Sequence, residues 1–424
     1  MLKGVIILGG PVKGTRFRPL SLERPKPLFP IAGVPTLQHH VEKLASVPGL
    51  REILIIGFYQ PSHITPFVTD LHRDLPNVNI RYLQEFAPLG TAGGIHHFRD
   101  LILMGDPEAI FVINSDVCGD LPLEEMAAFR KEKGKDASCV VLTTEATREQ
   151  SLNYGCIVIE PSTRAVAHYV EKPATYVSHH INCGIYLITP KLFAQLAEVF
   201  NAKALQNQPF NGGEATEAAE TIWFERDIFP SLAGSHHFLA FQTNNWWSQI
   251  KTAAAAIYAN RHCLSLYRKT HPERLCATGD DAGPTIIGDV FIHPSAHVHH
   301  SAVIGPNVSI GRDAVISHGV RIRESIILEG ANVHEHACIL YSIVDRESAV
   351  GAWSRVEGTP TGPNPNMPFA KLEMKSLFLP DGRLNPAITI LGRNVSVHAE
   401  TILLNCIVLP HKDLSSSCKN QIIL

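Results

Sequence analysis

A glycine-rich turn with basic neighbours near the start of the chain holds the first residues suited to chemistry. The apolar run 5–8 ends in two glycines, the second of which is Gly10, and a short basic loop leads to Gly14. Arg16 and Lys26 follow soon after. A buried parallel strand entering such a turn brings backbone N–H groups and cations to the sheet edge where phosphates bind. The spacing fits neither the P-loop nor the dinucleotide fingerprint. It predicts a phosphate-binding turn of another kind, and the alternative is a solvated basic loop.

A carboxylate and an amide follow a second apolar run. Residues 111–113 are apolar and lead directly into Asn114-Ser115-Asp116. A buried strand here would place Asp116 at the ligand edge of a sheet, where Mg²⁺ takes one or two carboxylates together with phosphate oxygens. We therefore expect Asn114 and Asp116 to contact a ligand, although Asp116 taken alone fits a helix N-cap better.

Residues 84–94 form another strand-to-glycine turn, with Glu85 at its start and Gly90 inside it. Backbone groups at Gly90 and the carboxylate of Glu85 suit the edge of a nucleobase. A carboxylate accepts hydrogen bonds well from the N1–H and amino groups of guanine. By itself the stretch is equally compatible with a simple turn.

Two tripeptides further along offer groups suited to a hexose-1-phosphate: Glu171-Lys172-Pro173 and Asn182-Cys183-Gly184. Lys172 would hold the phosphate, and Glu171 and Asn182 would bond sugar hydroxyls. Either tripeptide alone is a weak signal.

Alternating apolar runs and helical patterns must position these residues. The expected strands within residues 1–255 are 4–8, 52–57, 80–83, 109–113, 138–143, 155–159, 165–170 and 184–188. Helical patterns fall between them, for example at 36–44, 122–132 and 190–199. This alternation predicts an α/β, Rossmann-like domain with a mostly parallel sheet, whose ligands lie beyond the carboxyl ends of the strands.

A six-residue period takes over after a polar stretch, 256–285, that we expect to be a linker. The apolar positions of this period are Ile292, Val298, Ile304, Ile310, Ile316, Ile322 and Leu328. A second series with the same spacing runs from Ala296 to Ile326. The pattern predicts a parallel β-helix of hexapeptide repeats over residues 286–424, with a phase slip near Asn332.

A proline-rich interruption at about 357–386 fits no coil of such a β-helix, so we expect it to loop out. Loops of this length in compact folds are usually functional or disordered. The sequence leaves an interaction role and disorder equally open.

Composition limits the partners. At 424 residues the chain should contain two or three domains. A net charge of -3 and a pI near 6.7 give no electrostatic case for nucleic acid or a membrane surface as a partner.

Nine cysteines without a C-x-x-C pair argue against a disulfide framework and a zinc site. No run approaches the length of a membrane span, so we expect no membrane segment and a cytoplasmic location.

The opening stretch resembles the signature of sugar-1-phosphate nucleotidyltransferases, G-G-x-G-T-R-x-x-P-L with a later P-K-P, apart from two extra residues, Val12-Lys13. In their order, all the stretches above are similar to the mannose-1-phosphate guanylyltransferase (GDP-mannose pyrophosphorylase) family. That family joins an N-terminal nucleotide-binding domain to a C-terminal left-handed β-helix. The resemblance thus covers essentially the whole chain and implies this fold.

The resemblance also implies roles for individual residues, and the residue expected for one of these roles is missing. In the family, positions matching Arg16 and Lys26 handle phosphates, and those matching Asp116 and a later Asp hold the metal. The family pattern W-x-D-I-G reads Trp247-Ser248-Gln249-Ile250-Lys251 here, so neutral Gln249 replaces the second carboxylate. Its loss should cost several kcal/mol of transition-state stabilisation, on the order of a thousandfold in rate. No catalytic residue is therefore expected, and Arg16 and Lys26 are degenerate counterparts.

An altered phosphate loop and a missing metal ligand resemble the regulatory alpha subunits of this family. The resemblance implies a GDP-mannose site made of Gly10, Gly14, Glu85, Gly90, Asn114, Asp116, Glu171, Lys172, Asn182 and Gln249. Binding would need no cofactor, and Mg²⁺ at Asp116 would matter only if some catalysis remained. The implied partners are a catalytic beta subunit, which the proline-rich loop would contact, and further copies of this chain. The alternative is an active guanylyltransferase that makes GDP-mannose from GTP and mannose-1-phosphate.

Histidines on the repeat region raise a third function, because some hexapeptide acyltransferases use a catalytic histidine. The residues concerned are His293, His297, His299, His300, His318, His334 and His336. Most lie outside the apolar series, so we expect them on the coil surface and claim no second active site.

Overall fold

The computed structural model describes residues 1–10, 14–133, 136–206, 221–277, 283–373 and 375–424. The chain divides into two compact units. The N-terminal unit comprises Met1–Lys13, Leu37–Trp247 and Asn364–Lys371. The β-helix unit comprises Gly14–Thr36, Ser248–Pro363 and Leu372–Leu424.

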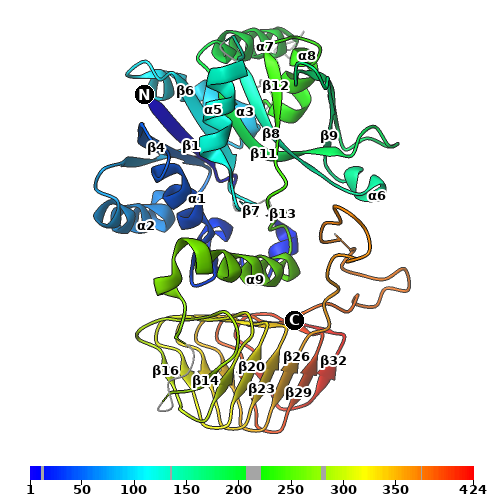
Figure 1. Ribbon diagram of the computed structural model, residues 1–424. Coiled ribbons are helices and arrows are strands. Elements are labelled where there is room, and N and C mark those ends of the chain that lie inside the picture. Colours follow the sequence, from blue (N-terminus) through cyan, green and yellow to red (C-terminus); the bar gives the residue numbers. More distant parts are fainter. Residues whose placement is uncertain (11–13, 134–135, 207–220, 278–282, 374) are drawn as a thin grey trace, which may run out of the picture. The chain divides into compact units, whose positions relative to one another are not determined.

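A nine-stranded mixed sheet forms the middle of the N-terminal unit (Figure 1). Its order is β10-β9-β11-β6-β1-β4-β5, and β8 pairs with both β11 and β12. Strands β6, β1, β4 and β5 are parallel neighbours, whereas β11 runs antiparallel to β6. The strands are β1 (Leu2–Ile7), β4 (Leu50–Gly57), β5 (Asn79–Gln84), β6 (Ala109–Asn114), β8 (Cys139–Glu145), β9 (Gly155–Ile159), β10 (Val166–Glu171), β11 (His180–Ile188) and β12 (Phe238–Gln242). Short strands β2 (Pro30–Ile31), β3 (Val34–Pro35), β7 (Val117–Gly119) and β13 (Trp247–Gln249) lie outside this sheet.

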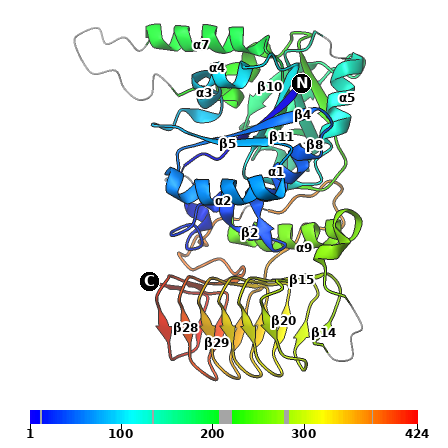
Figure 2. The same ribbon diagram turned by 90° about the vertical axis from the view of Figure 1, so that its left-hand side faces the viewer.

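Helices pack against the sheet, with α2 beside β5, α3 beside β4 and α5 beside β8 (Figure 2). The helices are α1 (Thr36–Ala45), α2 (Pro61–Asp74), α3 (Gly90–His97), α4 (Arg99–Leu103), α5 (Leu123–Lys133), α6 (Arg148–Ser151), α7 (Leu192–Gln206) and α8 (Phe229–Leu232). A π-helical turn, Phe224–Ile228, precedes α8. The predicted α/β fold with a mostly parallel sheet is confirmed.

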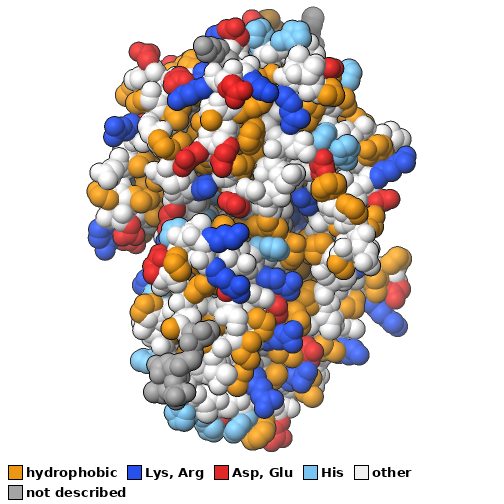
Figure 3. All heavy atoms as spheres, viewed as in Figure 1, with side chains coloured by type: hydrophobic (Ala, Val, Ile, Leu, Met, Phe, Trp, Pro, Cys, Tyr) orange, Lys and Arg blue, Asp and Glu red, His pale blue; other side chains and the backbone are white. Residues whose placement is uncertain are grey.

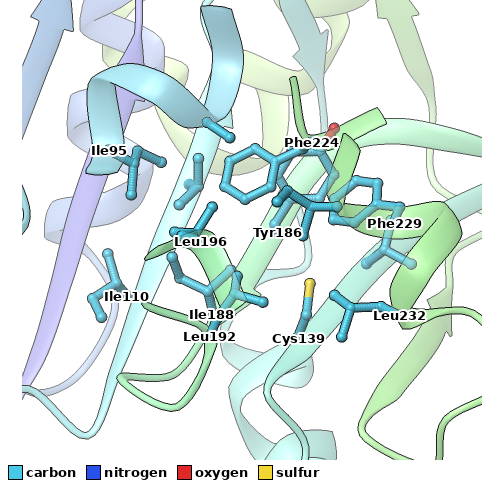
Figure 4. Close-up of a cluster of buried hydrophobic side chains, with 14 of the residues drawn as sticks. Ile95, Ile110, Cys139, Tyr186, Ile188, Leu192, Leu196, Phe224, Phe229 and Leu232 are labelled. Atoms are coloured by element: carbon cyan, nitrogen blue, oxygen red, sulfur yellow. The ribbon is translucent and has the colours of Figure 1, made fainter. Parts of the chain in front are cut away.

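The core of the N-terminal unit is built from apolar side chains of the sheet and the covering helices (Figure 4). Phe229 is fully buried, and its ring centroid lies 4.9 Å from that of Tyr186, 5.4 Å from that of Phe224 and 5.0 Å from that of Phe238. Full burial of one such side chain contributes about 1.5–3 kcal/mol. This cluster packs β11 and β12 against α8.

Three parallel sheets form the β-helix, as the six-residue period predicts, and the arrangement is consistent with a left-handed β-helix. The first sheet contains β14 (Thr285–Ile286), β17 (Val303–Ile304), β20 (Arg321–Arg323), β23 (Cys338–Leu340), β26 (Arg355–Glu357), β29 (Ile402–Leu404) and β32 (Cys418–Lys419). The second contains β15 (Val290–Ile292), β18 (Val308–Ile310), β21 (Ile326–Ile327), β24 (Ser342–Val344), β27 (Thr389–Leu391), β30 (Ile407–Val408) and β33 (Ile422–Ile423). The third contains β16 (His297–Val298), β19 (Val315–Ile316), β22 (Asn332–Val333), β25 (Ala349–Val350), β28 (Ser396–Val397) and β31 (Asp413–Leu414).

The phase slip of the repeat lies earlier than the sequence suggests. Ile304 pairs with Ile322, 18 residues on, whereas Ile310 pairs with Ile327, 17 residues on. The coil therefore shortens by one residue between Ile322 and Ile327, next to Glu324 with its φ of 48°. The expected position near Asn332 is wrong because Ile327, rather than Leu328, occupies the paired position.

The proline-rich interruption lies between β26 and β27. Strand β27 pairs directly with β24, with Ser342 opposite Thr389, so the ladder continues as though the interruption were absent. Within the interruption, Asn364–Lys371 groups with the N-terminal unit.

Helix α9 (Ala253–Thr270) corrects the expected linker at 256–285. Thr252 caps its start, where its side chain accepts from the amide of Ala255 at 3.3 Å. The buried side chains recur at helical spacing, so the polar character of the exposed side concealed a packed helix. Within the β-helix unit, the buried Asn260 amide accepts from the Ala32 amide at 2.8 Å and from the Ser309 hydroxyl at 2.9 Å.

The histidines of the repeat region lie on the coil surface, as expected. His299, His318 and His336 are exposed, and the ring of His336 stacks on that of Trp353 with 4.2 Å between centroids. On the face drawn in Figure 3 acidic and basic side chains are interspersed, in keeping with the small net charge. Among the described residues, no helix is long and apolar enough to cross a membrane.

Candidate functional site

At the glycine turn after β1, the chain at Gly9 and Gly10 lies close to Phe58. The amide of Phe58 donates to the Gly9 carbonyl at 2.8 Å, and a side chain at Gly10 would meet the Cβ of Phe58 at 3.1 Å. Gly9 has a φ of 68°, which favours glycine. Residues 11–13, and with them the Val12-Lys13 insertion, lie outside the described residues.

The basic part of the motif belongs to the β-helix unit. Gly14, with a φ of 91°, precedes a 3₁₀ turn, Thr15–Phe17, that carries the exposed Arg16. The ammonium of Lys26 lies 5.7 Å from the ring centroid of Phe17. In the same unit, Arg24 pairs with Glu329 at 2.5 Å. Gly14, Arg16 and Lys26 are therefore in a different compact unit from the glycines that precede them.

Asn114 ends β6 and Asp116 follows two residues later, at the carboxyl ends of the parallel strands. Asn114 pairs with Ile7 in the sheet, and its side-chain oxygen is buried with no hydrogen-bond partner among the described residues. No ion pair among those residues includes Asp116. A buried acceptor and a carboxylate at this edge suit a ligand that carries hydroxyl or amide donors.

His40 lies close to this edge. Its Nε2 is 2.7 Å from the carbonyl oxygen of Val117, the residue after Asp116. Burial lowers the pKa of His40 to about 4, and this hydrogen bond and the charge of Asp116 oppose the shift only in part. The imidazole is therefore neutral at physiological pH and donates to Val117.

Glu85 and Gly90 lie at the junction of β5 and α3. Glu85 is 4% exposed, and a side chain at Gly94 would collide with its carboxylate. Gly90 has a φ of 85°, and a side chain there would collide with the Ile222 carbonyl. That carbonyl accepts from the amides of Ala92 and Gly93 at 3.0 and 3.2 Å, so these first amides of α3 already have a partner.

The next group of predicted residues lies on β10 and β11, which are separated in the sheet by β9. Glu171 ends β10, Lys172 follows it, and Asn182 lies in β11. The ammonium of Lys172 lies 3.6 Å from a Glu171 carboxylate oxygen. Asn182 donates to the hydroxyls of Tyr169 at 3.1 Å and Tyr186 at 3.0 Å. The Asn182 oxygen accepts from the Gly184 amide at 2.8 Å. Both donors of Asn182 are thus used inside the protein, which gives this side chain a role in positioning its neighbours.

The tyrosines extend this network to residues that the sequence did not indicate. Tyr169 donates to Glu171 at 3.1 Å, and Tyr186 donates to Glu225 at 3.1 Å. Thr91 donates to the other oxygen of Glu225 at 2.8 Å. Burial raises the pKa of Glu225, and these donors oppose the shift only in part. No motif marks Glu225, because the residues around it follow no chemical pattern.

Gln249 ends β13 and belongs to the β-helix unit. Its side-chain oxygen is buried and lacks a hydrogen-bond partner among the described residues. Just before it, Trp246 accepts from the amide of Asp120 at 3.0 Å, and Trp247 donates from its indole to the Cys183 carbonyl at 3.0 Å. The structure therefore assigns four predicted residues to the β-helix unit, namely Gly14, Arg16, Lys26 and Gln249, and the other eight to the N-terminal unit.

The fold and these sheet-edge residues define the class of protein. A family model described as nucleotidyl transferase matches residues 3–222, and one described as GMPPB C-terminal domain matches residues 286–423. The fold is also similar to a solved Bacillus anthracis chain described as a glucose-1-phosphate thymidylyltransferase. That likeness has a TM-score of 0.50 and 22% identity, and it covers 66% of this chain and 98% of the other. The chain has a nucleotidyltransferase domain followed by a β-helix.

Full-length relatives narrow the class to one family. The chain is 55% identical over 425 residues to the Danio rerio protein named mannose-1-phosphate guanylyltransferase regulatory subunit alpha-A. It is 56% identical over 427 residues to the Xenopus tropicalis regulatory subunit alpha and 55% identical over 426 residues to that of Homo sapiens. Each comparison covers 100% of both chains. The chain belongs to the family of mannose-1-phosphate guanylyltransferase regulatory subunits alpha.

Proposed function

We propose that this chain is the regulatory, non-catalytic subunit of a mannose-1-phosphate guanylyltransferase complex. It binds GDP-mannose in its N-terminal domain and controls synthesis by a catalytic beta subunit as product feedback. The names of its full-length relatives support the regulatory role and a catalytic partner. Cytoplasmic location and self-association are part of the proposal.

Gln249 is the observation that carries the proposal. A catalytic site of this type needs Mg²⁺ to neutralise the triphosphate, and Asp116 would be its one charged ligand in the predicted pair. A neutral amide at position 249 offers the ion no charge. Because its buried oxygen has no hydrogen-bond partner among the residues that the structure describes, Gln249 instead suits a donor group of a bound ligand.

Two measurements on the full chain test the proposal. Calorimetry should show GDP-mannose binding, and an assay of Mg²⁺-dependent pyrophosphate release from GTP and mannose-1-phosphate should show negligible turnover. Adding the chain to a purified catalytic subunit should make that subunit more sensitive to inhibition by GDP-mannose. Absence of GDP-mannose binding would sink the proposal, and robust turnover without a partner would establish the alternative, an active guanylyltransferase.

Gln249→Asp sharpens the test. A restored carboxylate should raise turnover steeply in the presence of Mg²⁺, because it returns a charged ligand to the metal site. Gln249→Asn has the same length as the aspartate and no charge, so it is the matched control and should stay inactive.

A further inference from the structure

The proline-rich interruption of the β-helix brings one lysine, Lys371, into the N-terminal unit. Gln150 holds the backbone of Lys371 from both sides. The side-chain amide of Gln150 donates to the Lys371 carbonyl at 2.7 Å, and its oxygen accepts from the Lys371 amide at 2.7 Å. This reciprocal pair fixes where the lysine side chain begins.

The ammonium of Lys371 lies among groups that solvate it poorly. It is 3.4 Å from the hydroxyl oxygen of Thr144 and 5.9 Å from the centroid of the Trp247 ring. Burial lowers the pKa of Lys371, and the nearby Cys183 and Glu145 oppose the shift only in part. None of the ion pairs among the described residues includes Lys371. A half-buried ammonium with no carboxylate partner costs stability, and such a cost is retained where a ligand requires the charge.

The surroundings of Lys371 connect it to the predicted ligand residues. The Trp247 ring centroid lies 5.7 Å from that of Tyr154. Burial, and next the charge of Asp116, raises the pKa of Tyr154 to about 12. Thr143, the neighbour of Thr144, pairs with Asn182 across β8 and β11. Lys371 therefore occupies the same sheet edge as the residues expected to bind a nucleotide sugar.

We propose that Lys371 is an anion-binding residue of the N-terminal unit and contacts a phosphate group of the bound molecule. An ammonium at this position supplies positive charge to a diphosphate, the charge that a metal ion would otherwise provide. Trp247, beneath the ammonium, stands two residues before Gln249, where the metal carboxylate is missing. The nature of the anion as a nucleotide-sugar diphosphate rests on the proposed function, whereas the anion site itself does not.

Calorimetry with the full chain tests the ligand role. The probes are GDP-mannose, GDP, inorganic pyrophosphate and the uncharged nucleoside guanosine. Lys371→Met should weaken binding of every phosphate-containing probe by roughly 10- to 100-fold, the size of a charge-assisted hydrogen bond, and leave guanosine unchanged. Lys371→Arg keeps the charge and should retain most of the affinity.

Thermal unfolding separates a ligand role from a structural one. Lys371→Met removes a poorly solvated charge, so the ligand-free variant should unfold at the same or a higher temperature than the wild type while its shift with pyrophosphate shrinks. The matched control is Lys375→Met in the same interruption, whose exposed ammonium lies 3.8 Å from Glu373 and which should change neither property.

Each outcome decides the proposal. Unchanged pyrophosphate and GDP affinity in Lys371→Met, or a clear loss of stability without ligand, would overturn it. Failure of the wild type to bind any phosphate probe would overturn it too. Pyrophosphate binding that depends on Lys371, in a protein that does not bind GDP-mannose, would support the anion site and reject the proposed function.

Discussion

The β-helix and the N-terminal sheet hold their residues by different means. In the β-helix each coil repeats the one before it, and a buried position such as Ile322 asks only for an apolar side chain that stacks on its neighbours. At the sheet edge each position depends on particular atoms. Gly90 must lack a Cβ, His40 must present a donor to Val117, and Asn182 must use both its amide hydrogens. We therefore expect the β-helix to accept one apolar residue in place of another, and the sheet edge to accept few substitutions.

A charge inside the β-helix should have the largest effect. Ile322→Asp buries a carboxylate among apolar side chains and should cost at least about 4 kcal/mol in the free energy of unfolding. Ile322→Val keeps the class of residue and should cost only about 0.5–1.5 kcal/mol. Urea denaturation measures both. Arg321→Asp, at the exposed neighbour, is the control, and a cost there equal to that of Ile322→Asp would contradict the argument.

A methyl group at the sheet edge should have the next largest effect. Gly90→Ala forces a residue with a Cβ to hold a φ of 85° and to displace the Ile222 carbonyl, so we expect a cost of about 2–4 kcal/mol. Gly382→Ala has a similar φ of 82° but open space around the new methyl group. It should cost about 1 kcal/mol. Equal unfolding midpoints for the two variants would show that the collision does not matter.

Acid should weaken the N-terminal unit through His40. The unfolded chain binds a proton near pH 6.5 and the folded chain only near 4, so stability falls as the pH drops through this window. Between pH 7 and pH 5 the loss should be about 2 kcal/mol. His40→Gln keeps a donor for Val117 and should remove this pH dependence in denaturation experiments. His318→Gln, at an exposed β-helix histidine, should leave it in place.

The hydroxyl of Tyr169 should have the smallest effect. Tyr169→Phe leaves one donor of Asn182 and one oxygen of Glu171 without their partner and should cost about 1 kcal/mol. Tyr176→Phe, at an exposed ring, is the control and should cost nothing measurable in the same assay. A larger loss at Tyr176 would mean that the buried network contributes little.

The sequence predicted most of the fold because both regions have strong periods. Strand β9 has the predicted bounds, and β4, β5 and β6 differ from theirs by two residues or fewer at each end. The predictions were wrong where the same sequence pattern fits two different structures. Helix α9 looked polar because its exposed side is polar and its buried side also includes Asn260. The coil that loses a residue keeps apolar side chains on both sides of the slip.

The sheet-edge residues were less predictable because their roles depend on contacts between distant segments. Position along the chain indicated Asn114 and Asp116, since a carboxylate after a buried strand marks the ligand edge. It could not reveal that Asn182 donates both its amide hydrogens to tyrosine hydroxyls, or that the Lys371 backbone accepts a hydrogen bond from Gln150. These contacts join residues with no local pattern in common.

The pairing of Ser342 with Thr389 across the interruption makes the β-helix a modular scaffold. Because the ladder closes beneath the extra chain, the length of that chain adds only a slowly growing entropic cost. The interruption can therefore lengthen, shorten or change its sequence over evolution while the coils above and below it keep their register. A segment attached in this way can diverge independently of the solenoid that carries it.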